Sequence, residues 1–284
     1  PATHRERPER DAAQRRPGDA VGEGHDRVQA GHAGDAAREV GGVHDGDPAR
    51  RGGVGPDLLL ERAEERGMST GVVSTARITH ATPAVNYAHI SNRDWEANNT
   101  IDRDLGANVL PAGCTKVKDI AAQLVDFKVG NGLEVALGGG RPYFEPNTKA
   151  DPEYPSRMGN RTDGRDLTAE WAAKPGAAYV WNKAQFDAVD PRRTRRLLGL
   201  FEPSHVKYEA DRANDTAGEP SVAEMPRKAI EMLQKNPKGF YLMVEGGRID
   251  HAHHAGNAYR ALTDTIALAE AVKVAREMTD DEDT

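Results

Sequence analysis

Cysteine and aromatic residues are scarce in this chain of 284 residues. Its single cysteine, Cys114, excludes an internal disulfide and a zinc cluster built from several thiolates. Aromatic residues make up 5% and hydrophobic residues 37% of the chain, while Gly and Pro number 29 and 17. Such averages are typical of a half-structured chain, and the two ends of this one differ in character.

Long apolar runs and a surplus of positive charge are also missing. No run approaches the roughly 18–20 residues that a membrane span requires, and no signal peptide is recognisable at the N-terminus. The net charge is −7, whereas binding a nucleic-acid backbone requires a basic face. We therefore expect no membrane span and no nucleic-acid partner.

Residues 1–57 contain no Ile, Met, Lys, Phe, Tyr or Trp. They are built mainly from Arg, Gly, Ala, Asp, Pro and His, and neither a helical nor a strand period runs through them. They offer few side chains that can fill a core. Two interpretations are open, a disordered charged arm and the out-of-frame translation of a GC-rich gene. On either one, we predict that the folded domain begins at residue 58.

Regular structure is predicted from there onward. The predicted elements are a helix at 58–66 ended by Gly67, a strand at 71–75, a helix at 118–127 and a strand at 133–137. Residues 145–220 are rich in Pro, Asp, Arg and Gly, with short apolar islands such as 197–201. This composition predicts long loops over that segment.

The C-terminal stretch has the clearest pattern. Ser221–Glu224 (SVAE) is a capping box that opens a helix to about Gln234. Residues 240–244 (FYLMV) are typical of a strand buried on both faces of a parallel sheet. Residues 258–278 predict a long helix with apolar side chains at three- and four-residue steps, namely Leu262, Ile266, Ala269, Val272 and Ala275. The element order predicts an α/β layered fold.

Acidic and imidazole side chains directly follow the predicted strand at 240–244. Residues 245–254 (EGGRIDHAHH) hold two carboxylates and three histidines. Ligands of open parallel sheets bind at the carboxyl ends of the strands, so a site is expected here. Asp250 and His254 are four residues apart and would share one side of a helical turn. Carboxylate with imidazole suits Zn²⁺, and oxygen ligands suit Mg²⁺. A solvated loop without a ligand is the alternative.

A second polar cluster lies at residues 79–93 (THATPAVNYAHISNR). Arg93 can form a two-pronged clamp on phosphate or carboxylate oxygens. Taken alone this signal is weak, because an isolated arginine at a helix end is more often a partner in a surface ion pair.

Together, the two clusters resemble the alkaline phosphatase family. Residues 244–255 (VEGGRIDHAHHA) resemble its metal loop, and residues 75–84 (TARITHATPA) with Asn92 and Arg93 resemble its magnesium and phosphate segment. Supporting matches are residues 112–115 (AGCT), 137–141 (LGGGR), 198–201 (LGLF) and 258–262 (AYRAL). The resemblance covers about residues 58–284 in the order and rough spacing of the family. It implies a three-layer α/β/α fold with a mostly parallel central sheet.

The resemblance also implies a role for each matched position. Asp250 and His254 would bind a catalytic Zn²⁺. Thr82 and Glu245 would be Mg²⁺ ligands, and His80 would touch that ion through water, as groups behind the direct ligands tune metal sites.

The implied reaction is hydrolysis of phosphate monoesters through a phosphoserine intermediate, assisted by two metal ions. Arg93 would clamp two non-bridging phosphate oxygens. His251 and His253 match positions that have no general role in the family.

Parts of the family pattern are missing. The sequence holds neither the Asp-Ser-Ala segment of the nucleophile nor the upstream Gly-Asp-Gly strand end, and the Asp-His strand of the second zinc site does not follow. We therefore expect residues 58–284 to be a partial catalytic domain with a sheet incomplete at both ends, poorly stable and inactive. An alternative frame of Gly24–Gly34 permits ATTGSKPGTLG, which resembles the sequence after the family's serine and favours a frameshift over residues 1–57.

Two other functions stay open, a sulfatase- or phosphoglycerate-mutase-like relative and a non-enzymatic metal-binding remnant. Thr82, Arg93, Glu245 and Asp250 together favour a phosphatase with a phosphate monoester as substrate. The resemblance further implies that intact family members are homodimers and are periplasmic or extracellular. It does not predict the compartment of this chain.

Overall fold

The computed structural model describes residues 58–107, 117–280, 282 and 284. The chain divides into two compact units, 1–40 and 41–284, and the described residues belong to the second unit. The expectations for residues 1–57, the match at 112–115 and Cys114 lie outside the described residues.

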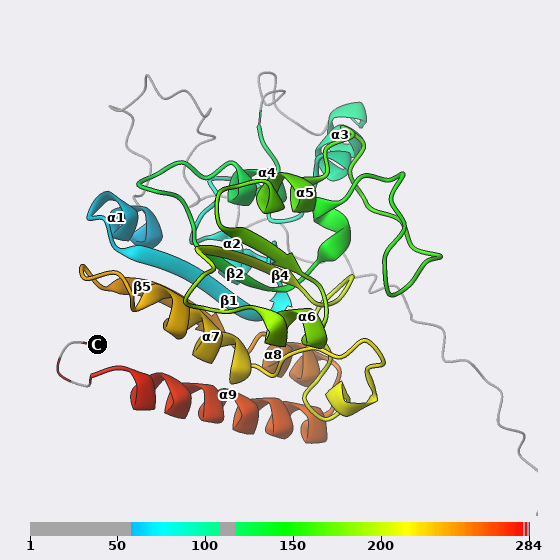
Figure 1. The fold of residues 1–284 in the computed structure, drawn as a ribbon. Helices are drawn as coiled ribbons and strands as arrows, with labels where there is room; N and C mark the ends of the chain where they lie inside the picture. The colour runs from blue at the N-terminus through cyan, green and yellow to red at the C-terminus, as the bar shows by residue number, and fades with distance from the viewer. Residues whose placement is uncertain (1–57, 108–116, 281, 283) are drawn as a thin grey trace, which may run out of the picture. The chain divides into compact units, whose positions relative to one another are not determined.

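The centre of the described unit is a five-stranded parallel sheet (Figure 1). Its strand order is β3-β4-β2-β1-β5. The strands are β1 (Ser69–Arg77), β2 (Val135–Gly139), β3 (Ala177–Val180), β4 (Arg196–Leu200) and β5 (Phe240–Glu245). β1 pairs with β2 on one side and with β5 on the other, so the chain order reverses at β1. Such a reversal is where open parallel sheets form ligand sites.

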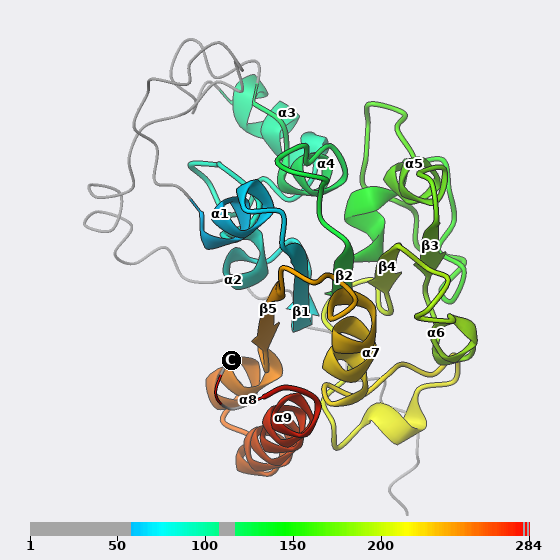
Figure 2. The same cartoon turned by 60° about the vertical axis from the view of Figure 1, so that its left-hand side comes forward.

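Helices cover both faces of the sheet (Figure 2). The first core contains side chains of α1 (Leu59–Glu65), α2 (Ala81–Ala84), α4 (Ile120–Val125) and α5 (Leu167–Ala172). The second core contains side chains of α6 (Lys183–Ala188) and α7 (Glu224–Leu233). The remaining described elements are α3 (Asn98–Gly106), η3 (Arg141–Phe144), η4 (Arg212–Asn214), α8 (Arg248–His254) and α9 (Ala258–Met278).

The sheet separates these two cores because neighbouring residues of a strand point to opposite faces. Val72 of β1 packs in the first core and Val73 in the second, and Ala136 and Leu137 of β2 divide in the same way. The three-layer α/β/α fold with a parallel central sheet is thus confirmed.

Most predicted elements lie where the sequence placed them. Gly67, with φ of 75°, ends α1 in the left-handed conformation that favours glycine. The capping box before α7 is confirmed in both directions, since Ser221 N–H donates to Glu224 (2.8 Å) and Glu224 N–H donates to the Ser221 hydroxyl (3.2 Å). Ile120 and Leu124 of α4, within the helix predicted at 118–127, are buried.

The prediction of long loops over residues 145–220 is wrong for residues 167–200, whereas residues 145–166 form no helix or strand. Residues 145–220 contain α5, β3, α6, η4 and β4, and β4 lies inside the sheet between β3 and β2. The apolar residues at 197–200 are therefore a strand covered on both faces. A strand of five residues that is buried on both faces shows no alternation, so it resembles an apolar island in a loop.

The predicted burial of the strand at 240–244 on both faces is also wrong, whereas the predicted helix at 258–278 is present as α9. β5 is partly exposed along all six residues, because it forms an edge of the sheet and pairs only with β1 among the described strands. On α9, Leu262, Ile266 and Val272 are 64%, 64% and 55% exposed. The helix packs on α7 and α8 and instead buries Ala261, Asp264, Ala271 and Val274. Three of these four buried residues carry only small or medium-sized apolar side chains, and the larger apolar residues Leu262 and Ile266 turn outward.

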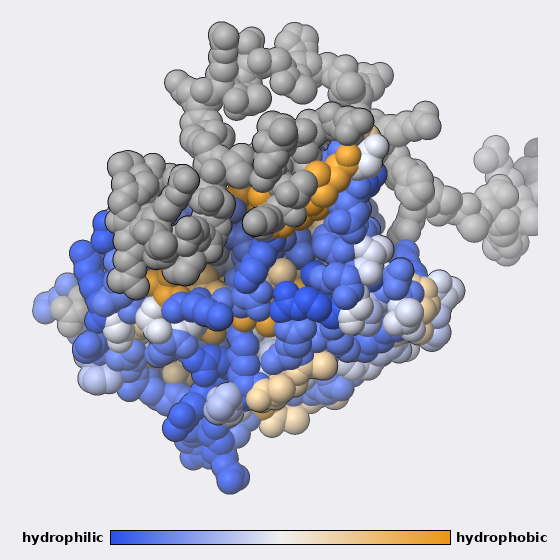
Figure 3. All heavy atoms as spheres, turned by 90° about the horizontal axis from the view of Figure 1, so that it is seen from above, coloured by the Kyte–Doolittle hydropathy of each residue, from blue (hydrophilic) through white to orange (hydrophobic). Residues whose placement is uncertain are grey.

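The molecular face in Figure 3 is mainly hydrophilic and is broken by smaller apolar patches. No helix in the described ranges combines the length and the apolarity needed to cross a bilayer.

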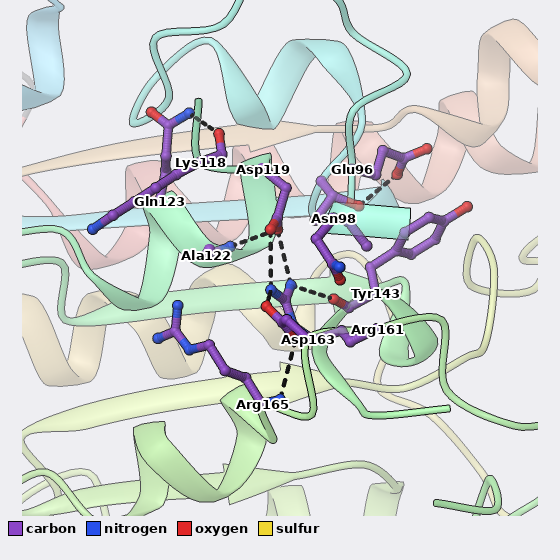
Figure 4. Close-up of polar contacts among 12 residues, drawn as sticks. Glu96, Asn98, Lys118, Asp119, Ala122, Gln123, Tyr143, Arg161, Asp163 and Arg165 are labelled. Carbon is purple, nitrogen blue, oxygen red and sulfur yellow. Dashed lines mark hydrogen bonds and ion pairs between the residues drawn. The ribbon is translucent and has the colours of Figure 1, made fainter. Parts of the chain in front are cut away.

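A buried ion pair fixes the segment between β2 and α5 (Figure 4). Arg161 is fully buried and donates from both terminal nitrogens to Asp119, at 2.9 and 3.0 Å. Asp119 is also the N-cap of α4 and accepts the Ala122 N–H at 2.9 Å. Asp163 accepts two further hydrogen bonds from Arg161. One guanidinium thus joins the loop to α4, whose apolar side chains pack in the first core.

We expect Arg161→Met to destabilise the fold by about 3–5 kcal/mol, because it leaves the buried Asp119 carboxylate without its partner. The double variant Arg161→Met/Asp119→Asn removes that charge and keeps the cap, so it should recover part of the loss. Urea unfolding of both variants measures the difference. A single variant within about 1 kcal/mol of the parent would contradict this account.

Two buried carboxyl groups meet at the start of β1. The Thr70 hydroxyl donates to Glu64 at 2.6 Å, and the Thr70 N–H donates to Glu134 at 2.7 Å. Glu64 and Glu134 are 2% and 9% exposed. Burial raises the pKa of Glu64 to about 7, and the neighbouring Glu134 adds to the rise. Burial also raises the pKa of Glu134.

A carboxyl whose pKa is raised by folding stabilises the fold while it is protonated, and this stabilisation is lost as the pH rises through the folded-state pKa. The contribution of Glu64 should therefore be full below about pH 4.5 and lost through about pH 7. We expect Glu64→Gln to gain about 2 kcal/mol relative to the parent between pH 5 and pH 8. Thermal melts at both pH values measure this gain. The difference between the two proteins isolates Glu64 from other groups that titrate in this range, and parallel pH profiles would refute the prediction.

Candidate metal and phosphate site

A pocket of about 260 Å³ lies at the carboxyl ends of β1 and β5. Five of the six predicted site residues line it, and they come from two stretches of chain more than 150 residues apart. The lining residues are Ala76, His80, Ala81, Thr82, Arg93, Glu245, Gly247, Asp250 and His251. The remaining predicted residue, His254, does not line this pocket.

The pairing of β1 with β5 fixes the position of the Glu245 carboxylate. Ser74 lies opposite Glu245 in the parallel register, and the Ser74 hydroxyl donates to Glu245 Oε2 at 2.5 Å. The same hydroxyl accepts the Ala76 N–H at 2.8 Å. Glu245 is therefore held at the strand end by a side chain of the neighbouring strand.

Two glycines then let the chain turn tightly from β5 into α8. A Cβ atom on Gly247 would lie 2.9 Å from the Ala76 Cβ, so a larger residue would push α8 away from β1. The Arg248 N–H donates to the Thr75 hydroxyl at 3.0 Å and ties the start of α8 to β1. This close approach brings Asp250 to the mouth of the pocket.

The loop after β1 supplies the basic and hydroxyl groups. Thr82 lies in the short helix α2, whose N-cap is His80. Arg93 Nη2 lies 3.1 Å from His80 Nε2, and because a guanidinium only donates, His80 Nε2 is the acceptor. Burial, followed by the charges of Arg77 and Arg93, lowers the pKa of His80 to about 4. His80 is therefore a neutral imidazole at physiological pH.

The predicted pair Asp250 and His254 lies one turn apart on α8. His254 Nε2 is 3.5 Å from Asp250 Oδ1, and the two side chains are 80% and 74% exposed. Asp250 and His254 thus share one side of α8, as predicted. That side faces outward, and only Asp250 lines the pocket.

Two further histidines surround the site. The rings of His205 and His251 lie 4.1 Å apart, and each lies within 6 Å of the His80 ring. Arg77 N–H donates to His205 Nδ1 at 3.1 Å. Burial, followed by the positive charges around them, lowers the pKa of His251 to about 4 and the pKa of His205 further. The sequence gives no signal for either residue, because the position of His251 has no general role in the family and the composition around His205 predicts a loop.

An acidic cluster lies apart from these residues and had no signal in the sequence, because its members are far apart in the chain. Glu153, Glu202 and Asp215 each offer an oxygen, and these oxygens lie within 4.8 Å of one another. Asp215 Oδ2 and Glu219 Oε2 are buried and accept no hydrogen bond. Burial, followed by a hydrogen bond with Asp215, raises the pKa of Glu153 to about 7. An all-oxygen donor set of this kind suits Ca²⁺.

The fold and the pocket define an α/β protein whose polar ligand site lies where the strand order reverses. The family model for alkaline phosphatase matches residues 55–284. The tissue-nonspecific alkaline phosphatase of Gallus gallus is 46% identical over 233 residues, covering 80% of this chain and 43% of that protein. The Homo sapiens isozyme is 42% identical over 233 residues, covering 80% and 42%.

Solved structures agree with this assignment. The Thermus thermophilus alkaline phosphatase is 34% identical with a TM-score of 0.58, covering 76% of this chain and 37% of that chain. The cold-active enzyme of a psychrophilic Shewanella species is 28% identical with a TM-score of 0.54. This chain belongs to the alkaline phosphatase family, and it spans less than half the length of the curated relatives described above.

We expect Ca²⁺ to raise the melting temperature of the protein through the acidic cluster, since a ligand that binds only the folded state stabilises it. Protons compete with the metal, so the effect should grow as the pH rises through about 7, where Glu153 loses its proton. Calorimetric melts with and without Ca²⁺ measure it. Glu202→Gln/Asp215→Asn should abolish the shift, and Glu277→Gln on α9 is the matched control. An equal shift in both variants would contradict the assignment.

Proposed function

We propose that this chain carries the magnesium side and the phosphate clamp of a phosphate monoester hydrolase. The observation that supports the proposal is the single pocket in which Arg93, His80, Thr82, Glu245 and Asp250 converge. A cationic clamp beside oxygen ligands is the combination that phosphate and a divalent metal require together.

The chemistry of each side chain fits its proposed role. Thr82 and Glu245 supply the hard oxygen donors that Mg²⁺ prefers, and the neutral His80 accepts a hydrogen bond behind them. Arg93 has no carboxylate ion pair among the described residues. Its guanidinium is therefore available to hold two oxygens of a phosphoryl group.

Asp250 and His254 form the carboxylate and imidazole pair that we assign to Zn²⁺. Zinc takes four ligands in proteins, so this pair supplies half of a site. Bound metal ions supply charge stabilisation and an activated oxygen nucleophile in this class of reaction. The residues of this chain bind and orient the phosphoryl group, and Arg93 neutralises charge on its equatorial oxygens.

We further propose that this chain binds phosphate without turnover. The sequence contains no Asp-Ser-Ala segment to supply the nucleophile expected from the family resemblance. Phosphate hydrolysis then belongs to intact family members, which the resemblance also implies to be homodimers. A non-enzymatic metal-binding role is the second candidate, favoured by the outward-facing Asp250 and His254 pair.

We expect inorganic phosphate to bind in the presence of Mg²⁺ and Zn²⁺, and Arg93→Ala to weaken binding about 10- to 100-fold. This range corresponds to the loss of a charge-assisted hydrogen-bond pair of about 1.5–3 kcal/mol. Isothermal titration calorimetry measures both affinities. Arg192→Ala, which removes an exposed arginine outside the pocket, is the matched control and should leave the affinity unchanged.

Two outcomes separate the candidates. Metal binding without phosphate binding would favour the metal-binding role. Hydrolysis of p-nitrophenyl phosphate that depends on Arg93 would show that the chain contains a nucleophile and would overturn the proposed lack of turnover.

A further inference from the structure

A second polar pocket lies at the opposite ends of the strands, where β1, β2 and β4 begin. Its volume is about 390 Å³, larger than that of the pocket at the strand ends. The lining residues are Ser69, Asn131, Glu134, Arg195, Arg196, Met232, Lys235 and Asn236. We call this the basic pocket. Ser69 begins β1 and Ala76 of the first pocket lies near its end, so the two pockets occupy opposite ends of one strand.

The lining of the basic pocket contains three cationic side chains, Arg195, Arg196 and Lys235, and one carboxylate. Among the described residues, no carboxylate forms an ion pair with Arg195, Arg196 or Lys235. The carboxylate, Glu134, is 9% exposed and accepts the Thr70 N–H at 2.7 Å. This positive charge gathers on a chain whose net charge is −7.

Backbone carbonyls hold two of the cations in place. Arg196 Nη2 donates to the Asn131 carbonyl. Gly130 and Gly132, with φ of 57° and 89°, flank Asn131 and shape the turn that presents this carbonyl. Lys235 Nζ donates to the carbonyls of the loop before β4 at Pro191 and Thr194. These neutral partners position the cations without neutralising them, so their charge remains available to a ligand.

The other polar groups of the lining suit an oxygen-rich anion. Ser69, Asn131 and Asn236 add a hydroxyl and two amides next to the cations. Guanidinium groups form forked hydrogen bonds with phosphate and sulfate oxygens, and an ammonium adds a point charge. We propose that the basic pocket is a second anion site, which binds a small ligand bearing tetrahedral oxyanion groups such as sulfate, phosphate or diphosphate.

The proposal does not depend on phosphate binding at the first pocket. The test uses the full chain with Arg93→Ala, so that the first pocket does not compete for the probe. Inorganic pyrophosphate and sulfate are titrated at constant ionic strength, with calorimetry for the affinity and amide NMR spectra for the location. We expect the resonances of Asn131 and Asn236 to shift.

Paired variants of exposed residues test the assignment with little risk to folding. Arg195→Gln/Lys235→Gln should weaken pyrophosphate binding about tenfold or more, because both changes remove a cation from the pocket. Arg192→Gln/Arg193→Gln removes the same charge from the same basic segment outside the lining and should leave the affinity unchanged. Equal loss in the two pairs would show attraction by diffuse charge only. That result, or no binding of either probe, would overturn the proposal.

Discussion

The parallel pairing of β1 with β5 is the constraint on which the candidate site depends. Its register places Ser74 opposite Glu245, and it thereby joins two polar clusters that lie more than 150 residues apart in the sequence. Because side chains alternate between the faces of a strand, a slip of one residue would turn Glu245 to the other face. The tight turn at Gly247 and the bond from Arg248 N–H to Thr75 then fix α8 to the same strand end.

Buried charges support this arrangement away from the pocket. Arg141 and Arg161 lie in the long segment between β2 and α5, and both are fully buried. Arg141 forms an ion pair with Asp151 of the same segment, and Arg161 forms ion pairs with Asp163 and with Asp119 at the start of α4. This segment contains few apolar side chains, so polar bonds define its path. Breaking one such pair leaves an uncompensated charge in the interior, so these pairs hold the segment in its path.

The sequence could predict the elements that have a long periodic pattern or a local motif at their ends, and the residues adjacent to them. The capping box at Ser221 and the motif after β5 are local signals, and they located α7, Glu245 and Asp250. The short strand β4 and the outward face of α9 could not be predicted, because burial there is decided by neighbours that lie far away in the chain. The same reason hid His205, whose ring meets His251 only through the fold.

The carboxyl pair at Thr70 has a practical consequence for handling the protein. Its buried acids favour the folded state on the acidic side of neutrality. Metal ligands must be deprotonated before they bind an ion, so loading of the cation sites favours the alkaline side. The pH range in which a purified sample keeps longest therefore overlaps only partly with the range in which it holds metal. A buffer screen that optimises one property will move away from the other.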